Sequence, residues 1–383
     1  MVQIIWLQIY GGLARNSINF NSKVYMKNLF KYSMSAVAIL ASAVTLSSCN
    51  DWTDPESLDI HYPSFEEQNP QLYADYIKDL KNYKAEEHKM AIVSFDNPKN
   101  PAKQAERLTA MPDSLDFICL NNPDEISPDT QAEMVKIREK GTRTIYRVDY
   151  SSFETDWKAM VKENPELTEE EALKYIGERT DAMLILCDKY NYDGMIVDYT
   201  GRSLVSMRPE VLAEYNGRQQ LFFNKVLEWQ TKHTDKVLIY YGNIQYLVPE
   251  NMSMLKKYDY VILKTVDSSN ADDLSLKAYL AIQAGEDVKT ALYEGVNPVP
   301  TDRFIICVQL PQADDKDQIK GYWSTLNDKG EKILAAPGTA LWMGQTSSDF
   351  TRRGIFIQNV QNDYYNNTYE QLREVIYIMN PNK

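Results

Sequence analysis

The chain has 383 residues, a formal net charge of −13, and 26 tyrosines beside 6 tryptophans. Its length fits one large domain with short extensions, such as an α/β barrel of about 250 residues. The negative field and the absence of a Lys/Arg-rich run argue against nucleic acid as a partner. The many aromatic rings are compatible with a sugar ligand, because exposed rings stack on sugar faces.

The N-terminal region has the pattern of a lipoprotein signal peptide over residues 26–48. Lys27 and Lys31 supply its basic part, and an apolar run over residues 36–46 is too short to span a bilayer. The run ends in "LSSC", which resembles a bacterial lipobox with Cys49 as the lipidated residue. The alternative is an ordinary signal peptide followed by an incidental cysteine.

Residues 1–25 precede this complete signal sequence, and we interpret them as an extension from a start codon assigned too early. After the cysteine, the acidic stretch "NDWTDPESLD" resembles the export signals of surface lipoproteins in Gram-negative gut-type bacteria. We therefore expect a lipid-anchored protein on the outer face of the outer membrane. The expected parts of the mature chain are an acidic linker with a lead-in helix over 49–85 and a folded domain over 86–383.

The other cysteines lie in apolar contexts, and three thiols cannot all pair, so we expect buried free thiols at Cys119, Cys187 and Cys307. The three histidines are scattered without the spacing of metal ligands. The sequence therefore predicts neither a metal site nor a cofactor.

A helix with one apolar face is expected to begin at Asn69-Pro70, where proline suits the first helical position. Beyond it, short apolar runs alternate with helical segments. These runs are nearly continuous in hydrophobicity, which is typical of parallel strands covered on both faces. The predicted strands are 90–95, 115–120, 143–148, 194–199, 236–241, 259–264, 303–310 and 354–359.

Eight strands alternating with helices predict an α/β fold, a (β/α)₈ TIM barrel. A doubly wound open sheet is the alternative, but no G-x-G-x-x-G or P-loop follows any strand. Residues 331–344 are ambiguous between a helix broken at Pro337-Gly338 and a further strand. The predicted helix ends are Ser127-Pro128 with Gly141, and two capping boxes, Thr168 with Glu171 and Thr368 with Gln371.

In such a barrel, function is expected at the C-terminal ends of the strands. The residues there are mostly amides, carboxylates, hydroxyls and aromatic rings, which suit an uncharged hydroxylated ligand. They are Asp96, Asn97, Asn121, Asn122, Asp149, Tyr150, Asp198, Tyr199, Tyr241, Asn243, Lys264, Thr265, Gln309 and Gln358.

The fourth predicted strand, in "YDGMIVDYT", resembles the D-G-x-D-x-D-x-E signature of glycoside hydrolase family 18, the chitinases and endo-β-N-acetylglucosaminidases. Asp193 and Gly194 match its opening, and Asp198 matches its third aspartate. Ile196 stands where the second aspartate belongs, and Thr200 where the glutamate belongs. The ending "GIFIQNVQNDYYNN" also resembles the last strand and following loop of lipoprotein members. The alternative is that "NYDG" is only a turn before a plain strand.

In that family the glutamate protonates the glycosidic oxygen, the substrate's own N-acetyl group attacks the anomeric carbon, and the two aspartates orient the acetamide and tune the acid. A threonine hydroxyl cannot act as a general acid at pH 7. Ile196 also removes the carboxylate that would neighbour Asp198. The resemblance therefore implies a barrel that kept its sugar cleft and has no catalytic residue, with Thr200 at the position of the acid.

This interpretation predicts a protein that binds N-acetylglucosamine-containing glycans, including N-glycans, and passes them to an outer-membrane transporter and surface hydrolases. Asp193 and Gly194 are expected to be structural. The expected glycan contacts are Asp198, Tyr199, Tyr241, Asn243 and Gln309, with Trp342 as a stacking platform.

Two other functions remain open. One is an active endo-β-N-acetylglucosaminidase that uses a displaced acid, for which Asp149, Asp267 and Glu294 are the candidates. The other is a purely structural surface lipoprotein, because a fold does not imply a function.

Overall fold

The computed structural model describes residues 64–381. The predicted N-terminal extension, the signal peptide and the lipidation site at Cys49 lie outside these residues, as does most of the predicted linker.

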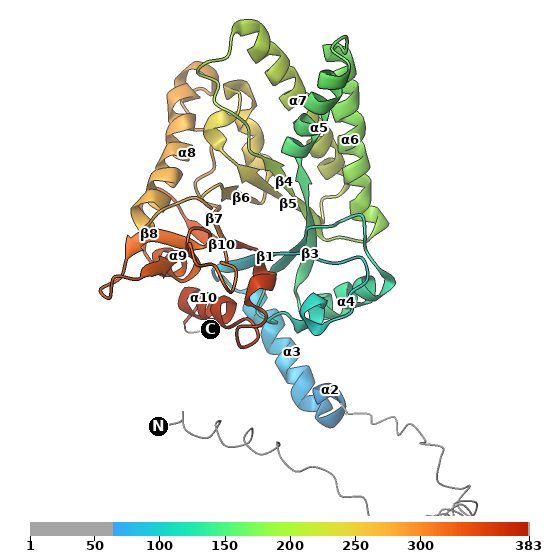
Figure 1. Cartoon of the computed structure of the whole chain (residues 1–383), viewed down its shortest axis with the longest axis vertical. Coiled ribbons are helices and arrows are strands. Elements are labelled where there is room, and N and C mark those ends of the chain that lie inside the picture. Colours follow the sequence, from blue (N-terminus) through green and yellow to red (C-terminus); the bar gives the residue numbers. More distant parts are fainter. Residues whose placement is uncertain (1–63, 382–383) are drawn as a thin grey trace, which may run out of the picture. The chain divides into compact units, whose positions relative to one another are not determined.

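Eight parallel strands close into a barrel, which confirms the predicted (β/α)₈ TIM barrel (Figure 1). Each strand lies within a few residues of the apolar run that predicts it. Around the barrel the order is β1 (Met90–Phe95), β10 (Arg352–Gln358), β7 (Phe304–Gln309), β6 (Tyr260–Leu263), β5 (Val237–Gly242), β4 (Gly194–Tyr199), β3 (Arg143–Asp149) and β2 (Phe117–Leu120).

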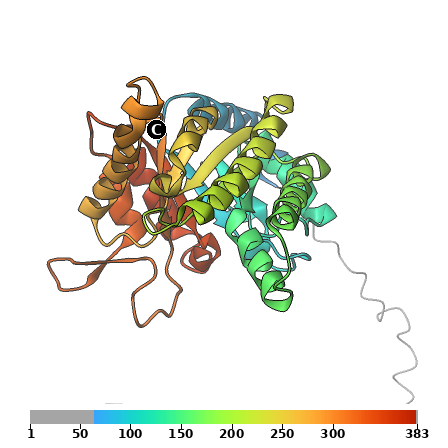
Figure 2. The ribbon, with the colours of Figure 1, turned by 90° about the horizontal axis from the view of Figure 1, so that it is seen from above.

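Helices surround the strands, as both ribbon views show (Figures 1 and 2). They are α4 (Pro128–Glu139), α5 (Tyr150–Glu163), α6 (Glu169–Lys189), α7 (Pro209–Lys232), α8 (Ala271–Leu292), α9 (Ala335–Met343) and α10 (Glu370–Met379). None of the helices that the structure describes is both long and apolar enough to cross a bilayer.

Two connections carry only 3₁₀ turns instead of an α-helix. After β1 these are η1 (Gln104–Glu106) and η2 (Leu108–Ala110), and after β5 they are η3 (Ile244–Tyr246) and η4 (Pro249–Lys257). A small hairpin of β8 (Tyr322–Leu326) and β9 (Lys332–Leu334) follows β7 and extends away from the helices (orange in Figure 2). A last 3₁₀ turn, η5 (Val360–Asp363), follows β10.

Alternate side chains of each strand point to opposite faces, so the barrel has an inner and an outer core. Ile196 of β4 belongs to the inner cluster with Ile239 and Phe356, whereas its neighbour Val197 belongs to the cluster between strands and helices. The three predicted free thiols are buried and unpaired, which confirms that expectation.

Two of the predicted helix starts are confirmed. The hydroxyl of Ser127 accepts a hydrogen bond from the N–H of Thr130 at 3.0 Å and so caps α4. Thr168 and Glu171 form the predicted capping box at the start of α6, each side chain accepting from the other's N–H. Local sequence therefore determines these two helix starts.

The capping box predicted at Thr368 with Gln371 is wrong. Thr368 has a left-handed backbone, with φ of 55°, instead of the extended conformation that an N-cap residue takes. Tyr369 is the N-cap of α10 and makes no side-chain cap. The cap comes from Asp363, whose carboxylate accepts the N–H of Leu372 at 2.8 Å.

The ambiguous segment 331–344 contains both a strand and a helix. The short strand β9 leads directly into α9, which passes Pro337 and Gly338 without a break. Pro337 lies in the first helical turn, where its missing N–H has no intrahelical partner to lose. Gly338 packs on Trp323, whose ring a Cβ would approach to 2.6 Å.

The lead-in helix α3 (Pro70–Ala85) begins at the predicted proline and follows the short helix α2 (Phe65–Gln68). None of its residues is buried. Near its end, the ammonium of Lys84 donates to the hydroxyl of Thr142 at 2.6 Å, just before β3 begins. The helix therefore meets the barrel at the N-terminal ends of the strands.

Candidate functional site

The inward-facing positions of β4 bring the signature residues into the barrel mouth. Because side chains alternate, Ile196, Asp198 and Thr200 share the inner face of the strand. Asp198 lies beside Asp149 of β3 and Tyr241 of β5 in the strand register. The carboxyl end of β4 therefore places Asp198 at the centre of the C-terminal face, between two neighbouring strands.

Asp198 is a buried carboxyl group in contact with a cation. Nη1 of Arg147 lies 3.6 Å from its Oδ2, and the hydroxyl of Thr200 donates to its Oδ1 at 3.4 Å. Burial raises the pKa of Asp198 to about 7, the charge of Asp149 adds to this effect, and Arg147 and Lys264 oppose it. Protonated and ionised forms are therefore both populated near neutral pH.

Thr200 occupies a position dominated by hydrogen-bond donors. The ammonium of Lys264 donates to its hydroxyl oxygen at 3.0 Å, and Nδ2 of Asn243 donates to its carbonyl oxygen at 3.1 Å. A hydroxyl in contact with an ammonium group thus lies where the signature pattern has a carboxylic acid. The only carboxylate that the described residues place in hydrogen-bond contact with the Thr200 hydroxyl is that of Asp198.

Tyr241 links the centre of the site to the opposite side of the barrel. Its hydroxyl accepts from Nε2 of Gln358 at 3.4 Å and from the thiol of Cys307 at 3.6 Å. Gln358 is paired in register with Gln309 of β7. We call this set of side chains the mouth: Arg147, Asp198, Thr200, Tyr241, Asn243, Lys264, Gln309 and Gln358.

Sequence reasoning did not select Arg147 for the site, and it named Lys264 as a strand-end residue but not as a glycan contact. Arg147 lies two residues after Ile145, which belongs to the inner cluster, so strand alternation also points Arg147 inward. A charged residue inside an otherwise apolar strand, in phase with interior residues, was the available signal. Lys264 directly follows β6 and had no such signal beyond its place at a strand end.

The structure corrects the expectation that Tyr199 contacts a ligand. Tyr199 is fully buried on the outer side of β4, where its ring packs against Tyr150 at a centroid distance of 4.9 Å. Its hydroxyl accepts from Nε2 of Gln219 at 2.8 Å. Strand alternation is the reason, since a residue between two inward positions points outward.

The structure also corrects the expectation that Trp342 is a stacking platform. Trp342 lies on α9, is 1% exposed, and donates from Nε1 to the hydroxyl of Ser275 at 2.9 Å. The guanidinium of Arg352 covers its ring at 4.1 Å. The indole is therefore part of the packing between helices and barrel.

The opening residues of the signature lie at the other end of β4 and have structural contacts. The carboxylate of Asp193 accepts from Nε and Nη2 of Arg138 at 2.9 and 3.1 Å and from the N–H of Thr144 at 2.8 Å. Gly194 has φ of 150°, and a Cβ there would lie 2.0 Å from the carbonyl oxygen of Val237. Both residues connect neighbouring strands at the barrel base.

The three candidate displaced acids lie in different places. Asp149 caps α5 by accepting the N–H of Ser151 at 2.9 Å. Asp267 is exposed on the segment after β6. Glu294 lies between α8 and β7, and such helix-to-strand connections run at the N-terminal end of a barrel, away from the mouth.

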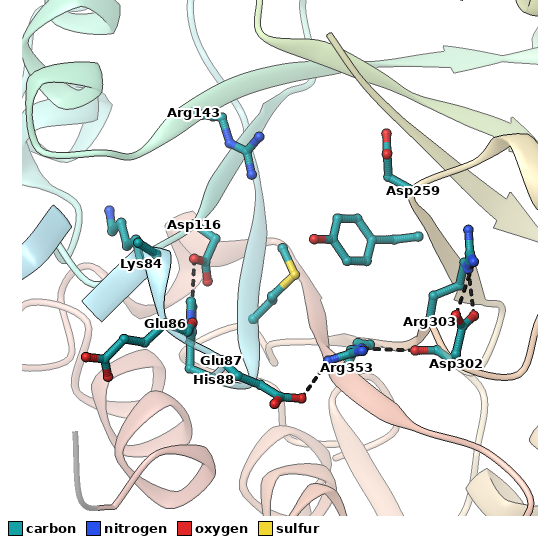
Figure 3. Close-up of a pocket in the computed structure, with 13 residues that line it drawn as sticks. Lys84, Glu86, Glu87, His88, Asp116, Arg143, Asp259, Asp302, Arg303 and Arg353 are labelled. Atoms are coloured by element: carbon teal, nitrogen blue, oxygen red, sulfur yellow. Dashed lines mark hydrogen bonds and ion pairs between the residues drawn. The ribbon is translucent and has the colours of Figure 1, made fainter. Parts of the chain in front are cut away.

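A cavity with a volume of about 620 Å³ lies at the N-terminal end of the barrel (Figure 3). Its charged side chains mostly pair with one another. His88 lies 2.9 Å from Asp116, and Arg303 lies 2.7 Å from Asp302. We interpret it as a stabilising charge cluster, because the catalytic and binding residues of these barrels lie at the opposite end.

Among the described residues no group of three or more His, Cys, Asp or Glu side chains could hold a metal ion.

The sequence profile of glycoside hydrolase family 18, BT1044-like, matches residues 53–378 of the chain. The chain belongs to glycoside hydrolase family 18. This confirms the resemblance of the β4 strand, although Ile196 and Thr200 depart from the signature of the family. No curated protein matches the chain.

The chain is similar to many solved structures, including the following three. A selenomethionine form of BT1044, with one glutamate replaced by glutamine, is 17% identical, covers 83% of this chain and 96% of its own, and has a TM-score of 0.55. An endo-β-N-acetylglucosaminidase from Cordyceps militaris is 16% identical, with coverage of 80% and 95% and a TM-score of 0.49. A family 18 chitinase from Pseudoalteromonas aurantia is 10% identical, with coverage of 76% and 99% and a TM-score of 0.46.

Proposed function

We propose that this family 18 barrel captures N-acetylglucosamine-containing glycans in its mouth and does not cleave them. The observation that carries the proposal is the contact between Lys264 and Thr200 at 3.0 Å. A threonine hydroxyl is too weak an acid to deliver a proton to a glycosidic oxygen at neutral pH, and its contact with Lys264 leaves no carboxylic acid at this position. The loss of a positioned acid typically costs about 10² to 10⁴ in rate.

The remaining mouth groups suit a sugar with hydroxyl and acetamide substituents. Asn243, Gln309 and Gln358 are partly exposed amides that both donate and accept hydrogen bonds. Asp198 accepts when ionised and donates when protonated, and its raised pKa makes both forms accessible. Such contacts exchange water bonds for protein bonds, so we expect modest affinity.

The cellular part of the proposal rests on the N-terminal sequence. We infer that Cys49 carries a lipid which holds the protein on the outer face of the outer membrane of a Gram-negative bacterium. From there it would pass bound glycans, N-glycans in particular, to surface hydrolases and an outer-membrane transporter. The "LSSC" motif and the acidic stretch after it support this location.

The test uses the mature chain from residue 50 with high-mannose and complex N-glycopeptides. Calorimetry measures binding, and mass spectrometry of the same mixtures after long incubation detects cleavage. We expect binding without cleavage, and Asp198→Asn to weaken it about tenfold or more, since hydrogen bonds to charged groups contribute about 1.5–3 kcal/mol. Asp235→Asn, an exposed carboxylate just before β5 at the opposite end of the barrel, is the matched control and should leave affinity unchanged.

One observation favours hydrolysis as a second candidate function. With its pKa raised to about 7, Asp198 is a carboxyl group that holds a proton near neutral pH, as a general acid must. If the wild-type chain cleaves N-glycopeptides, and Asp198→Asn does not cleave them even at concentrations that saturate it, the protein is an endo-β-N-acetylglucosaminidase with Asp198 as its acid. If the chain neither binds nor cleaves the glycopeptides, the remaining interpretation is a structural surface protein.

A further inference from the structure

Two cationic side chains of the mouth have hydrogen-bonding capacity that the described part of the chain does not use. Arg147 lies on the inner face of β3, and its ion pair within residues 64–381 is the one with Asp198 at 3.6 Å. Its guanidinium makes no hydrogen bond within these residues, although it carries five N–H donors. Lys264 donates to the neutral hydroxyl of Thr200 and has no ion pair in the same part of the chain. Both cations therefore have donors left for a ligand.

These two cations stand at the ends of one row of contacts on the C-terminal face. The row runs from Arg147 to Asp198, then from Asp198 to Thr200 at 3.4 Å, and from Thr200 to Lys264 at 3.0 Å. The side chain of Arg147 is 36% exposed, and Thr200 and Lys264 are half-buried. A ligand in the mouth can therefore contact the row, which has a positive charge at each end.

The carboxyl groups nearby do not fully balance this positive charge. Burial and the charge of Asp149 raise the pKa of Asp198 to about 7, so this carboxyl group is about half protonated at neutral pH. Asp149 is the other carboxylate close to the row, and its Oδ1 accepts the N–H of Ser151 at 2.9 Å. The mouth therefore has a small excess of positive charge in a chain whose formal net charge is −13.

The base of the same barrel shows how this chain pairs other arginines. Arg138 has two contacts with Asp193, at 2.9 and 3.1 Å, and Nε of Arg303 lies 2.7 Å from Asp302. A guanidinium binds anionic oxygens well because it presents two parallel N–H donors. Arg147 is half-buried but has no such contact within the described residues. An anionic ligand would supply it.

The negative charge of the whole chain does not prevent a small anion from binding here. Charges more than about 8 Å apart are largely screened at physiological ionic strength, so the groups nearest to the ligand decide. The overall charge still opposes a polyanion such as a nucleic acid. The half-buried amides of the mouth, Asn243, Gln309 and Gln358, remain available for the uncharged part of a sugar.

We propose that the sugar in the mouth carries an anionic substituent, a sulfate ester or a carboxylate, which binds between Arg147 and Lys264. This inference rests on the proposed function, and it adds that acidic members of the ligand class are preferred. Both substituents present negatively charged oxygens, which guanidinium and ammonium groups bind more strongly than neutral acceptors. The acetamide and hydroxyl groups of the same sugar would bind the mouth amides.

Asp198 should couple this binding to pH. A negative ligand beside it opposes its ionised form, so the ligand binds the protonated form better, and affinity should fall from pH 6 to pH 8. Burial raises the pKa of the Cys119 and Cys307 thiols to about 12, and it raises the pKa of Tyr241 far above its ordinary value. These three groups therefore stay neutral over this range. The charged groups that face Asp198 are Arg147, Asp149 and Lys264.

The test compares three monosaccharides on the mature chain from residue 50. They are N-acetylglucosamine, N-acetylglucosamine 6-sulfate and N-acetylmuramic acid, which share the acetamide sugar and carry no charge, a sulfate ester and a carboxylate. The set therefore also separates the two sources of negative charge. Calorimetry at pH 6 and low salt measures the affinities. The variant is Lys264→Met, and the matched control is Lys136→Met, an exposed lysine on α4.

We expect at least one anionic probe to bind the wild type about tenfold more tightly than N-acetylglucosamine, because hydrogen bonds to charged groups are roughly twice as strong as neutral ones. Lys264→Met should reduce this preference to about threefold or less, and Lys136→Met should retain it. Salt at about 0.5 M should also reduce it in the wild type, which needs no variant.

Three results would overturn the inference. One is equal affinity of the wild type for all three probes. Another is a preference for an anionic probe that is unchanged in Lys264→Met and in high salt. The third is the same pH dependence for the neutral and anionic probes, which would place the negative group away from Asp198.

Failure of the proposed function gives a different result. If the wild-type chain binds N-acetylglucosamine and N-glycopeptides without preferring either anionic probe, the proposed function holds and the inference is wrong. If it binds none of these ligands, both are wrong. If it binds the anionic probes but no N-glycopeptide, the inference holds and the N-glycan part of the proposed function is wrong.

Discussion

The ammonium nitrogen of Lys264 lies 3.0 Å from the hydroxyl oxygen of Thr200. Thr200 occupies the position that the family 18 signature gives to a glutamate. A glutamate introduced there would meet this cation. The pair would favour the ionised form of the new side chain and oppose proton donation. We therefore predict that Thr200→Glu alone does not create a glycosidase, and that N-glycopeptides stay uncleaved in mass spectra after long incubation.

The comparison for this prediction is the triple variant Ile196→Asp, Thr200→Glu, Lys264→Met. It restores both carboxylates of the signature and removes the competing cation. If the triple variant cleaves the glycopeptides and Thr200→Glu does not, the result supports an inhibitory effect of Lys264 on an acid at residue 200. Cleavage by Thr200→Glu alone would show that Lys264 does not suppress the acid.

A second prediction concerns pH and stability. The folded-state pKa of Asp198 is raised from an ordinary value of 3.8 to about 7, so the folded protein holds this proton more tightly than the unfolded chain. Its stabilising effect is complete below about pH 4 and is lost as pH rises toward 7. We therefore compare the free energy of unfolding of Asp198→Asn with that of the wild type. The difference, variant minus wild type, should become more positive by up to about 4 kcal/mol as the pH rises from 4 to 8.

Urea unfolding of both proteins across this pH range measures the effect. Any constant cost of leaving Arg147 without its carboxylate cancels from the pH-dependent part, because the guanidinium does not titrate in this range. Parallel stability curves for the two proteins would contradict the raised pKa.

A third prediction separates structure from function within the signature. Asp193→Ala removes the contacts with Arg138 and Thr144 that connect the bases of neighbouring strands. Losing this partly buried pair and its backbone hydrogen bond should lower the free energy of unfolding by about 2–3 kcal/mol. Glycan affinity should not change, because the mouth is at the other end of the strand.

Asp188→Ala is the control for that variant. Asp188 forms an exposed ion pair with His233 at the end of α6, and such pairs contribute about 0–1 kcal/mol. If the two substitutions lower the free energy of unfolding equally, Asp193 does not contribute more than an exposed ion pair, and the prediction is wrong.

A fourth prediction compares two tyrosine hydroxyls on adjacent strands. Tyr199→Phe breaks the bond with Gln219 behind the barrel and should cost about 1 kcal/mol of stability without changing glycan binding. Tyr241→Phe removes a hydroxyl that faces the mouth and should weaken glycan binding about three- to tenfold. Thermal unfolding and calorimetry on both variants check the pair, and a loss of binding in Tyr199→Phe would contradict the assignment.

Much of the fold is predictable from the sequence because barrel strands are covered on both faces. Continuous apolar runs such as those of β1 and β4 are typical of such buried parallel strands, and their alternation with helices fixes the fold class. The cap at Asp363 was not predictable in this way. It acts across nine residues on Leu372, through a loop whose left-handed residues have no capping-box pattern.

The site was predictable where strand phase is known. Asp198 points inward, and the same alternation points Tyr199 outward and Arg147 inward. Treating every strand end alike therefore selected two tyrosines too many, Tyr150 and Tyr199, and omitted Arg147. The position of Trp342 depended on whether its segment is a strand or a helix, and only the packing of α9 on Phe350 and Ser275 resolves that.

The entry of α3 at the base of the barrel has a consequence for how the binding face is presented. Lys84 and Thr142 join this helix to the end of the strands opposite Asp198. The helix therefore approaches the barrel at the end of the strands that lies away from Asp198. A glycan can then reach the mouth without steric hindrance from α3.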